Sequence, residues 1–218
     1  RYHGRLSAKE RAEVQSRFMG GETRIMVATN AFGLGIDKPD LRFVVHYNFP
    51  DSLERYVQEA GRAGRDGERA RAVLLYQLED RRLHSFFLRG KYPSRADWER
   101  VVEALRAGPG STLLEVPGVT RRHAQVVLAE LESARIVRRK AGTLTLRARA
   151  DAAALEHAIA AYEQRLEDDR ERLKAMMSYA QSTRCRAQLV ADYFAAAAEE
   201  PCGQCDNCRT DAPHALAS

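Results

Sequence analysis

The spacing of apolar positions over the first ninety residues predicts strands and helices in alternation. Three short apolar runs predict buried strands, at residues 23–29, 42–48 and 70–76. Amphipathic segments that follow Ser7 and Ser52 predict helices, and Glu10 completes a capping box with Ser7. Strands and helices that alternate in this way build a parallel sheet with right-handed crossovers. The sequence therefore predicts an α/β lobe here.

The pattern changes after residue 92, where the predicted elements become shorter. A helix at 97–107 and a helical turn at 111–118 precede a strongly amphipathic helix that Thr120 caps. Alternating apolar and basic positions at 136–147 then predict a β-hairpin. Three helices followed by a two-stranded wing are typical of a winged-helix domain, whose third helix enters the DNA major groove. The alternative is a helical adaptor that contacts protein, and the pattern leaves both open.

Helical periodicity returns in the last third of the chain. One long helix is predicted from residue 151 to about residue 179, with charge pairs along its outer face, and a second helix at 183–195. The chain thus divides into four predicted parts: an α/β lobe at 1–92, a winged-helix-like domain at 93–150, a helical hairpin with a cysteine knuckle at 151–212, and a tail at 213–218.

The composition excludes several classes of protein. Of 218 residues, 30% are charged and 44% are hydrophobic, as in ordinary globular proteins, and the apolar periodicity argues against disorder. No apolar run approaches the roughly 18 residues that span a bilayer, and the first residues contain no apolar signal-peptide core. We therefore expect a cytoplasmic protein with no membrane partner.

Positive charge concentrates in the middle of the chain. The net charge is +4 over residues 1–90, +6 over 91–150 and −5 over 151–218. The basic segment contains two clusters of cations, Arg121-Arg122 and Arg138-Arg139-Lys140. Clustered cations suit a polyanion, because each phosphate that they neutralise releases condensed counterions. A solvated basic face is the alternative interpretation of these five candidate DNA contacts.

All four cysteines lie near the C-terminal end, as Cys185, Cys202, Cys205 and Cys208. Four thiolates in tetrahedral geometry make a closed, structural zinc site, and the Cys-x2-Cys-x2-Cys knuckle has the spacing to turn around a metal ion. The clustering and the lack of an export signal disfavour two disulfides or four free thiols. An iron–sulfur cluster is the remaining rival, because Cys-only ligand sets also hold such clusters.

Two arginines and a glycine-containing loop have the features of a phosphate-handling site. In QEAGRAGR (58–65), Arg62 and Arg65 place two guanidinium groups close together at the end of a predicted helix. Planar, permanently charged groups suit a transferring γ-phosphoryl group, whose charge spreads over three oxygens. The loop at 28–35 is suited to direct backbone N–H groups at phosphate, and the Thr29 hydroxyl adds a donor.

These segments resemble the RecQ family of superfamily 2 DNA helicases. YHGRL (2–6) is similar to the end of helicase motif IV, ATNAFGLGIDKPDLRFVVH (28–46) to motif V and QEAGRAGRDG (58–67) to motif VI. TRCRAQLVADYF followed by EPCGQCDNC resembles the RecQ zinc subdomain. The resemblance covers about residues 1–90 and 165–208. It implies the second RecA-like lobe of an ATP-driven motor, followed by a zinc-binding subdomain.

The resemblance also implies roles for individual residues at the nucleotide. Arg65 matches the arginine finger, and Arg62 matches a second contact to the γ-phosphate. Asp37 matches the position that contacts the ribose, Gly35 belongs to the nucleotide-facing loop, and Gln58 would couple the nucleotide site to the DNA site. The implied cofactors are ATP and Mg²⁺ in the intact enzyme, besides structural Zn²⁺.

On the same basis, His3, Thr29 and Asn30 match positions that contact the backbone of single-stranded DNA. The implied function is that of a 3′–5′ ATP-dependent DNA helicase, nucleoid-associated in the cytoplasm and acting on single strands and duplex junctions. The alternative is a non-catalytic DNA-binding or structural module with a degenerate motor lobe.

Two features depart from the family pattern. RecQ proteins usually place the zinc subdomain directly after the second lobe, whereas here a winged-helix-like segment precedes the cysteines. The predicted hairpin tip at 140–143 also has no aromatic residue to stack on a base pair, which favours phosphate contact over strand separation.

The nucleotide site is incomplete in these 218 residues. They contain no Gly-x4-Gly-Lys-Ser/Thr motif and no acidic Mg²⁺-binding quartet. We therefore expect both in a first lobe upstream of Arg1, and we expect this fragment alone to be inactive.

Overall fold

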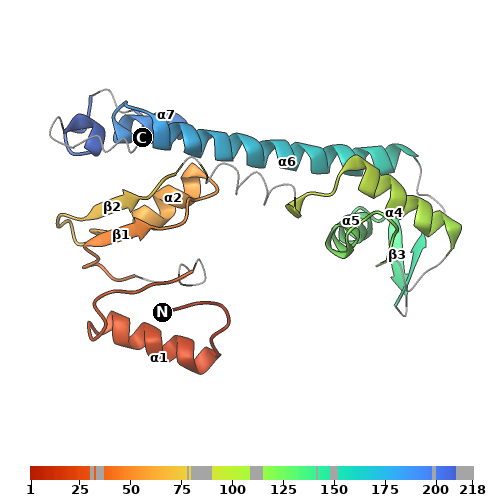
Figure 1. Cartoon of the computed structure of the whole chain (residues 1–218), viewed down its shortest axis with the longest axis horizontal. Helices are drawn as coiled ribbons and strands as arrows, with labels where there is room; N and C mark the ends of the chain where they lie inside the picture. The colour runs from red at the N-terminus through yellow and green to blue at the C-terminus, as the bar shows by residue number, and fades with distance from the viewer. Residues whose placement is uncertain are drawn as a thin grey trace. The chain divides into compact units, whose positions relative to one another are not determined.

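The chain forms two compact units (Figure 1): Arg1–Tyr76 together with Arg184–Ser218, and Gln77–Thr183. The computed structural model describes residues 1–29, 32, 37–77, 79, 90–108, 115–140, 142–147, 152–197 and 200–209. Within these residues, even the longest helix, with 30 residues, lacks the apolar stretch that crossing a membrane requires.

The first unit begins with helix α1, Ala8–Met19, as predicted. Its capping box is confirmed. The Glu10 amide donates to the Ser7 hydroxyl at 3.3 Å, and the Ser7 amide donates to Glu10 Oε2 at 2.8 Å. Phe18 on the same helix is buried and packs edge-on against the Phe32 ring, with 5.6 Å between centroids. The helix is thus fixed by a local cap and one aromatic anchor.

A parallel β–α–β arrangement follows, also as predicted. Strand β1, Phe43–His46, pairs in parallel with strand β2, Arg71–Leu74, and helix α2, Leu53–Ala60, lies between them in the chain. Ser52 caps α2, and the buried Tyr56 packs against the sheet, where its ring lies 5.0 Å from that of His46.

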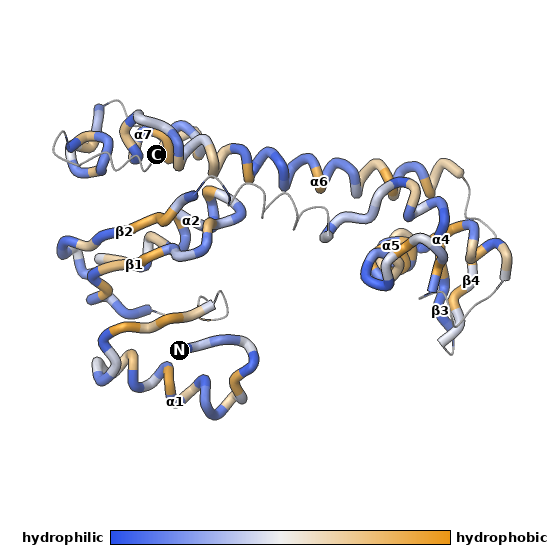
Figure 2. The backbone as a smooth tube through the Cα atoms, viewed as in Figure 1, coloured by the Kyte–Doolittle hydropathy of each residue, from blue (hydrophilic) through white to orange (hydrophobic). Residues whose placement is uncertain are grey.

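The two strands are covered on one face only, which corrects the expectation of fully buried strands. His46 is buried, whereas Phe43 and Val45 point to the opposite face and are each 48% exposed. Val73 of β2 is paired with Val45 and is also exposed. Figure 2 shows both strands as largely apolar segments. Parallel strands are usually covered on both faces. Among the described residues, one apolar face of this sheet therefore lacks a cover.

The predicted strand at 23–29 is wrong. In the described part of that segment, the one ladder contact is an isolated parallel bridge between Tyr2 and Ala28. Ile25 and Val27 are 64% and 71% exposed. A strand needs a neighbouring strand along its length, and the described residues supply only the backbone around Tyr2.

The second unit contains the helices and the hairpin predicted for the middle of the chain. Its elements are α4 (Arg95–Ala107), α5 (Arg121–Ser133), the antiparallel strands β3 (Val137–Lys140) and β4 (Thr143–Leu146), and α6 (Ala152–Gln181). Thr120 caps α5 as predicted. Helix α4 begins two residues before its predicted start, because Ser94 caps it in a box with Asp97.

One apolar core joins α4, α5, the hairpin and α6. Its buried members are Trp98, Val101, Val102, Leu105, Val116, Ala124, Val127, Leu128, Leu131, Ile136, Val137, Leu144, Ile159 and Tyr162. The winged-helix interpretation needs a further helical turn at 111–118, and residues 111–114 lie outside the described residues. That interpretation therefore stays a prediction.

The last elements belong to the first unit. They are helix α7, Arg186–Tyr193, and the short 3-10 helix η2, Asp206–Cys208. Helix α7 begins three residues after its predicted start, because Cys185, whose backbone is not helical (φ −52°, ψ 128°), stands at the N-cap.

Candidate functional site

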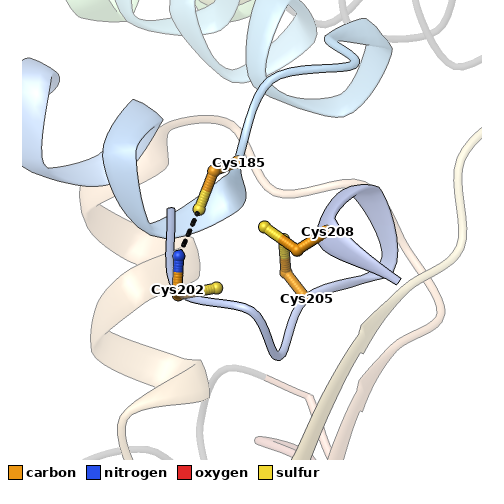
Figure 3. Close-up of side chains that lie close together, drawn as sticks. All are labelled: Cys185, Cys202, Cys205 and Cys208. Carbon is orange, nitrogen blue, oxygen red and sulfur yellow. Dashed lines mark hydrogen bonds between the residues drawn. The ribbon is translucent and has the colours of Figure 1, made fainter. Parts of the chain in front are cut away.

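The four predicted metal ligands come together in the first unit (Figure 3). Cys185 stands at the N-cap of α7, Cys205 at the N-cap of η2, Cys208 at the end of η2, and Cys202 on the preceding loop. Their Sγ atoms all lie within 4.8 Å of one another. Cys185 lies within the helix predicted at 183–195, but in the structure it directly precedes α7 instead of lying on it. The predicted grouping of the four cysteines is observed.

Backbone N–H groups are directed at the sulfur atoms. The Cys202 amide donates to Cys185 Sγ at 3.3 Å, and the Arg186 amide donates to Cys205 Sγ at 3.4 Å. The first of these bonds lowers the pKa of the Cys185 thiol to about 6, whereas the neighbouring Cys205 raises the pKa of Cys208 to about 12. Four sulfurs this close ionise together only when a cation balances their charge.

The sulfur cluster fits one zinc ion better than an iron–sulfur cluster. Zn–S bonds of about 2.3 Å at tetrahedral angles separate the sulfurs by about 3.8 Å. The observed spread of at most 4.8 Å reaches that value with small adjustments. An iron–sulfur cluster places iron and sulfide between its cysteines and needs a wider separation. The four cysteines form no disulfide, and together they satisfy a closed, structural Zn²⁺ site.

Polar contacts around the cysteines tie the knuckle to α7. Arg186 donates two hydrogen bonds to the Asp206 carboxylate, at 3.0 and 2.9 Å, and the Asn207 side-chain amide donates to the Arg184 carbonyl at 2.7 Å. The Arg186 guanidinium holds the pKa of Asp206 below its ordinary value. Both carboxylate oxygens of Asp206, the first residue of η2, are therefore engaged by Arg186. The only sequence signal for Arg186 is its position directly after the first cysteine.

Two residues predicted to face the nucleotide are in contact. Arg65 Nη1 donates to Asp37 Oδ1 at 2.6 Å, and Arg65 Nε donates to the Gly61 carbonyl at 3.4 Å. Both side chains of the ion pair are exposed. Motif V and motif VI are thus brought together at the residues that the resemblance assigns to ATP.

The backbone holds these two motifs together beside the ion pair. The Gly64 amide donates to the Leu41 carbonyl at 2.9 Å, and the Asp66 amide donates to the Pro39 carbonyl at 3.3 Å. Gly64 has φ +71°, and a Cβ atom there would lie 2.8 Å from the Glu68 carbonyl oxygen. Only glycine fits at this position without a shift of the backbone.

The structure describes two of the three remaining residues that were predicted to contact the nucleotide. Gln58 is exposed on α2, and Arg62 is half-buried just beyond the end of that helix. Gly35 lies outside the described residues, as does the DNA candidate Asn30.

The two other DNA candidates of this unit, His3 and Thr29, come from adjacent backbone segments. The Thr29 amide donates to the Tyr2 carbonyl at 3.0 Å, which places Thr29 beside the segment that carries His3. Thr29 is exposed and His3 is half-buried.

The basic candidates of the second unit differ in their surroundings. Arg121 and Arg122 are exposed at the start of α5, and Arg138 and Lys140 are exposed on β3. Arg139 instead donates two hydrogen bonds of 2.9 Å to the Glu132 carboxylate on α5. It fastens the hairpin to that helix.

Two family models match the chain. The model described as "Helicase conserved C-terminal domain" matches residues 1–67, and the model described as "RecQ zinc-binding" matches residues 149–209. The predicted nucleotide contacts fall within the first match, and the four cysteines fall within the second.

Named relatives agree with these models. The ATP-dependent DNA helicase RecQ of Bacillus subtilis (strain 168) is 50% identical over 88 residues, which are 40% of this chain and 15% of that protein. The ATP-dependent DNA helicase RecQ of Synechocystis is 34% identical over 220 residues, which cover 95% of this chain and 43% of that protein. The chain therefore spans less than half the length of either relative. Because the second alignment runs through the middle segment, that RecQ protein shares the segment ahead of the cysteines.

A solved structure, that of the DUF1998 helicase MrfA bound to DNA and AMPPNP, matches over 68% of this chain and 22% of that one, with 23% identity and a TM-score of 0.33. This likeness is too weak to indicate a common fold. The two family models, the RecQ relatives and the cysteine cluster together show that the chain belongs to the RecQ family, as a C-terminal region with a helicase C-terminal domain and a RecQ zinc-binding domain.

Proposed function

We propose that this chain is the C-terminal half of an ATP-dependent DNA helicase that moves 3′ to 5′ along single-stranded DNA and acts at duplex junctions. The names of the relatives support the activity, and the polarity rests on the family resemblance. A first RecA-like lobe upstream supplies the phosphate-binding lysine and the Mg²⁺-binding acids. ATP then binds between the two lobes, and this chain alone is inactive.

The contact between Arg65 and Asp37 carries the nucleotide part of the proposal. The two residues are 28 positions apart, and the fold joins them at 2.6 Å on an exposed edge. A guanidinium is planar and permanently charged, as stabilisation of a γ-phosphoryl group in transfer requires. In ATP the α- and β-phosphates separate the ribose from the γ-phosphate. Nucleotide binding therefore replaces this ion pair with separate contacts of Arg65 and Asp37.

The proposed DNA contacts lie in both units. In the first unit, Thr29 is exposed to meet the backbone of a single strand, with His3 on the adjoining segment. The second unit acts as a winged helix that meets phosphate through four exposed cations, Arg121, Arg122, Arg138 and Lys140. Among the described residues, these four make no ion pair with an acidic side chain.

Bound Zn²⁺ supplies no chemistry and holds the knuckle at the start of α7.

The decisive test is Arg65→Ala in the intact protein. We expect ATP turnover to fall by about 10³-fold or more, because an arginine finger is worth about 10³–10⁵ in rate. Binding of single-stranded DNA should persist, since Arg65 is not assigned to DNA. ATP turnover above a tenth of the wild-type rate would contradict the assignment.

Arg55→Ala is the matched control. Arg55 is a half-buried arginine of α2, the helix that precedes Arg65 in the chain, and its Nη1 lies 2.6 Å from Oδ2 of Asp51. This variant should keep wild-type turnover. If the wild-type protein binds DNA and hydrolyses no ATP, the chain is instead the non-catalytic DNA-binding module.

A further inference from the structure

A buried histidine pairs with a glutamate at the carboxyl end of the sheet. His46, the last residue of β1, has a side chain that is 6% exposed, and its Nε2 lies 2.9 Å from Oε2 of Glu59 on α2. The His46 ring also packs against Tyr56, with 5.0 Å between ring centroids. Among the described residues, Nδ1 of His46 has no hydrogen-bond partner. Glu59 is therefore the one described polar contact of this ring.

Glu59 lies in the segment that carries the proposed nucleotide contacts. It directly follows Gln58, and its carbonyl accepts the Arg62 amide at 3.3 Å. The Gly61 amide closes the same turn on the Val57 carbonyl at 2.8 Å. A rotation of this turn about the helix axis therefore moves Gln58 and Arg62 together.

The arginine segment, residues 61–65, is anchored separately at its C-terminal end. There the Gly64 amide donates to the Leu41 carbonyl, and Asp66 pairs with Arg42. The segment from Gly61 to Arg65 is thus held between two anchors, and the pair of His46 and Glu59 supplies the one on the helical side. Loss of this pair frees that side and leaves the other in place.

We infer that His46 and Glu59 are positioning residues for ATP turnover, an inference that rests on the proposed function. They act through Gln58, Arg62 and Arg65 and need not touch nucleotide. A hydrogen bond to a charged carboxylate is stronger and more directional than one between neutral groups. A misplacement of about 1 Å is enough to lower a rate by about 10²-fold. The pair thus sets the orientation that the arginines need.

The test is steady-state ATP turnover by the intact protein at saturating single-stranded DNA. We expect His46→Ala and Glu59→Ala each to lower kcat by about tenfold or more, with the KM for ATP changed less than about twofold. The double variant should lose no more than either single one, because the residues act as a unit. Glu59→Gln keeps a neutral acceptor for the His46 N–H and should recover part of the lost kcat.

His123→Gln is the matched control. It disrupts a comparable contact in the second unit, 3.1 Å between His123 Nδ1 and Asp97 Oδ2. It should leave kcat unchanged even where it lowers the Tm. Wild-type kcat in both alanine variants overturns the inference, as does an additive double variant. A loss of kcat that His123→Gln reproduces at an equal fall in Tm also overturns it.

Amide hydrogen exchange separates this inference from the proposed function. Each alanine variant should accelerate exchange at residues 57–66 of the intact protein and leave α1 unchanged. Unchanged exchange at 57–66 overturns the inference. If the wild-type protein hydrolyses no ATP, the proposed function fails, and the exchange experiment still decides whether the pair positions the arginine segment.

Discussion

The Tyr193 hydroxyl donates a 2.7 Å hydrogen bond to Oε1 of Glu54 and so joins the zinc-binding segment to α2, the helix that leads into motif VI. Tyr193 is the last residue of α7, whose N-cap is Cys185, and Glu54 lies in the first turn of α2. An acidic side chain at this end of α2 is favoured by the helix dipole. Within the first unit, the cysteine cluster and Gln58 are therefore connected through two short helices.

Loss of this hydrogen bond should weaken the first unit. We expect Tyr193→Phe to lower the free energy of unfolding of the intact protein by about 1 kcal/mol, because a bond to a carboxylate is lost while the ring remains. Urea denaturation measures the change. Tyr47→Phe removes the same hydroxyl from a residue that is 81% exposed and should be neutral. Equal effects of the two variants would show that the contact with Glu54 contributes nothing.

Removal of one cysteine should abolish stable metal binding. We expect metal analysis to find about one zinc ion per chain in the wild-type protein and almost none in Cys208→Ser, because a closed site needs all four thiolates. Asp206→Asn keeps every sulfur and loses only the charged partner of Arg186. It should retain the stoichiometry and bind zinc about 10- to 100-fold more weakly. Iron with sulfide in the wild-type protein would contradict the zinc assignment.

The stability of the second unit should depend on the ionisation of Asp97. Burial acts to raise the pKa of Asp97, but hydrogen bonds from Ser94 and His123 outweigh it and hold the pKa below its ordinary value. The carboxylate therefore stabilises the fold above about pH 4, and this contribution is lost as the pH falls through the lowered pKa. Asp97→Ala should cost about 1–2 kcal/mol at pH 7 and progressively less toward about pH 3.

Trp98 is the one tryptophan of the sequence and lies in the core of the second unit, so its fluorescence reports this unfolding. Glu103→Gln changes an exposed acid of the same helix and should leave the pH dependence as it is in the wild-type protein. If the free energies of unfolding of Asp97→Ala and the wild-type protein differ by the same amount at pH 7 and at about pH 3, the effect does not come from the ionised carboxylate.

Neighbouring arginines of β3 should differ in their effect on DNA binding. Arg138→Ala should weaken duplex binding by the intact protein and reduce the slope of log affinity against log salt by about 0.9, as for one lost phosphate contact. Arg139→Ala should change the slope less, because Glu132 already holds that guanidinium. Fluorescence anisotropy over a range of salt concentrations measures both. A larger change of slope for Arg139→Ala would place DNA on the other side of the hairpin.

Local chemistry explains the parts of the fold that are predictable from residues alone. The caps at Ser7, Ser52 and Thr120 are visible in the sequence because a capping side chain reaches only two or three residues along its own helix. The hairpin about Gly142 is visible for the same reason, since its strands adjoin the turn. The exposure of one face of β1 cannot be predicted from the sequence, because an apolar strand has the same residue pattern whether one or both of its faces are packed against other elements.

The sequence by itself determined the capped helices, the parallel strands on either side of α2 and the hairpin, and it singled out the four cysteines and the two arginines as candidates, since residue type and short spacing carry that chemistry. It did not determine every element, because the strand predicted at 23–29 is absent. Only the tertiary structure decided which side chains meet. Arg65 reaches Asp37 across 28 residues, His46 reaches Glu59 across 13 and Tyr193 reaches Glu54 across 139. These contacts depend on the path of the chain between elements, because side chains distant in sequence come within hydrogen-bonding distance only when their helices and strands pack.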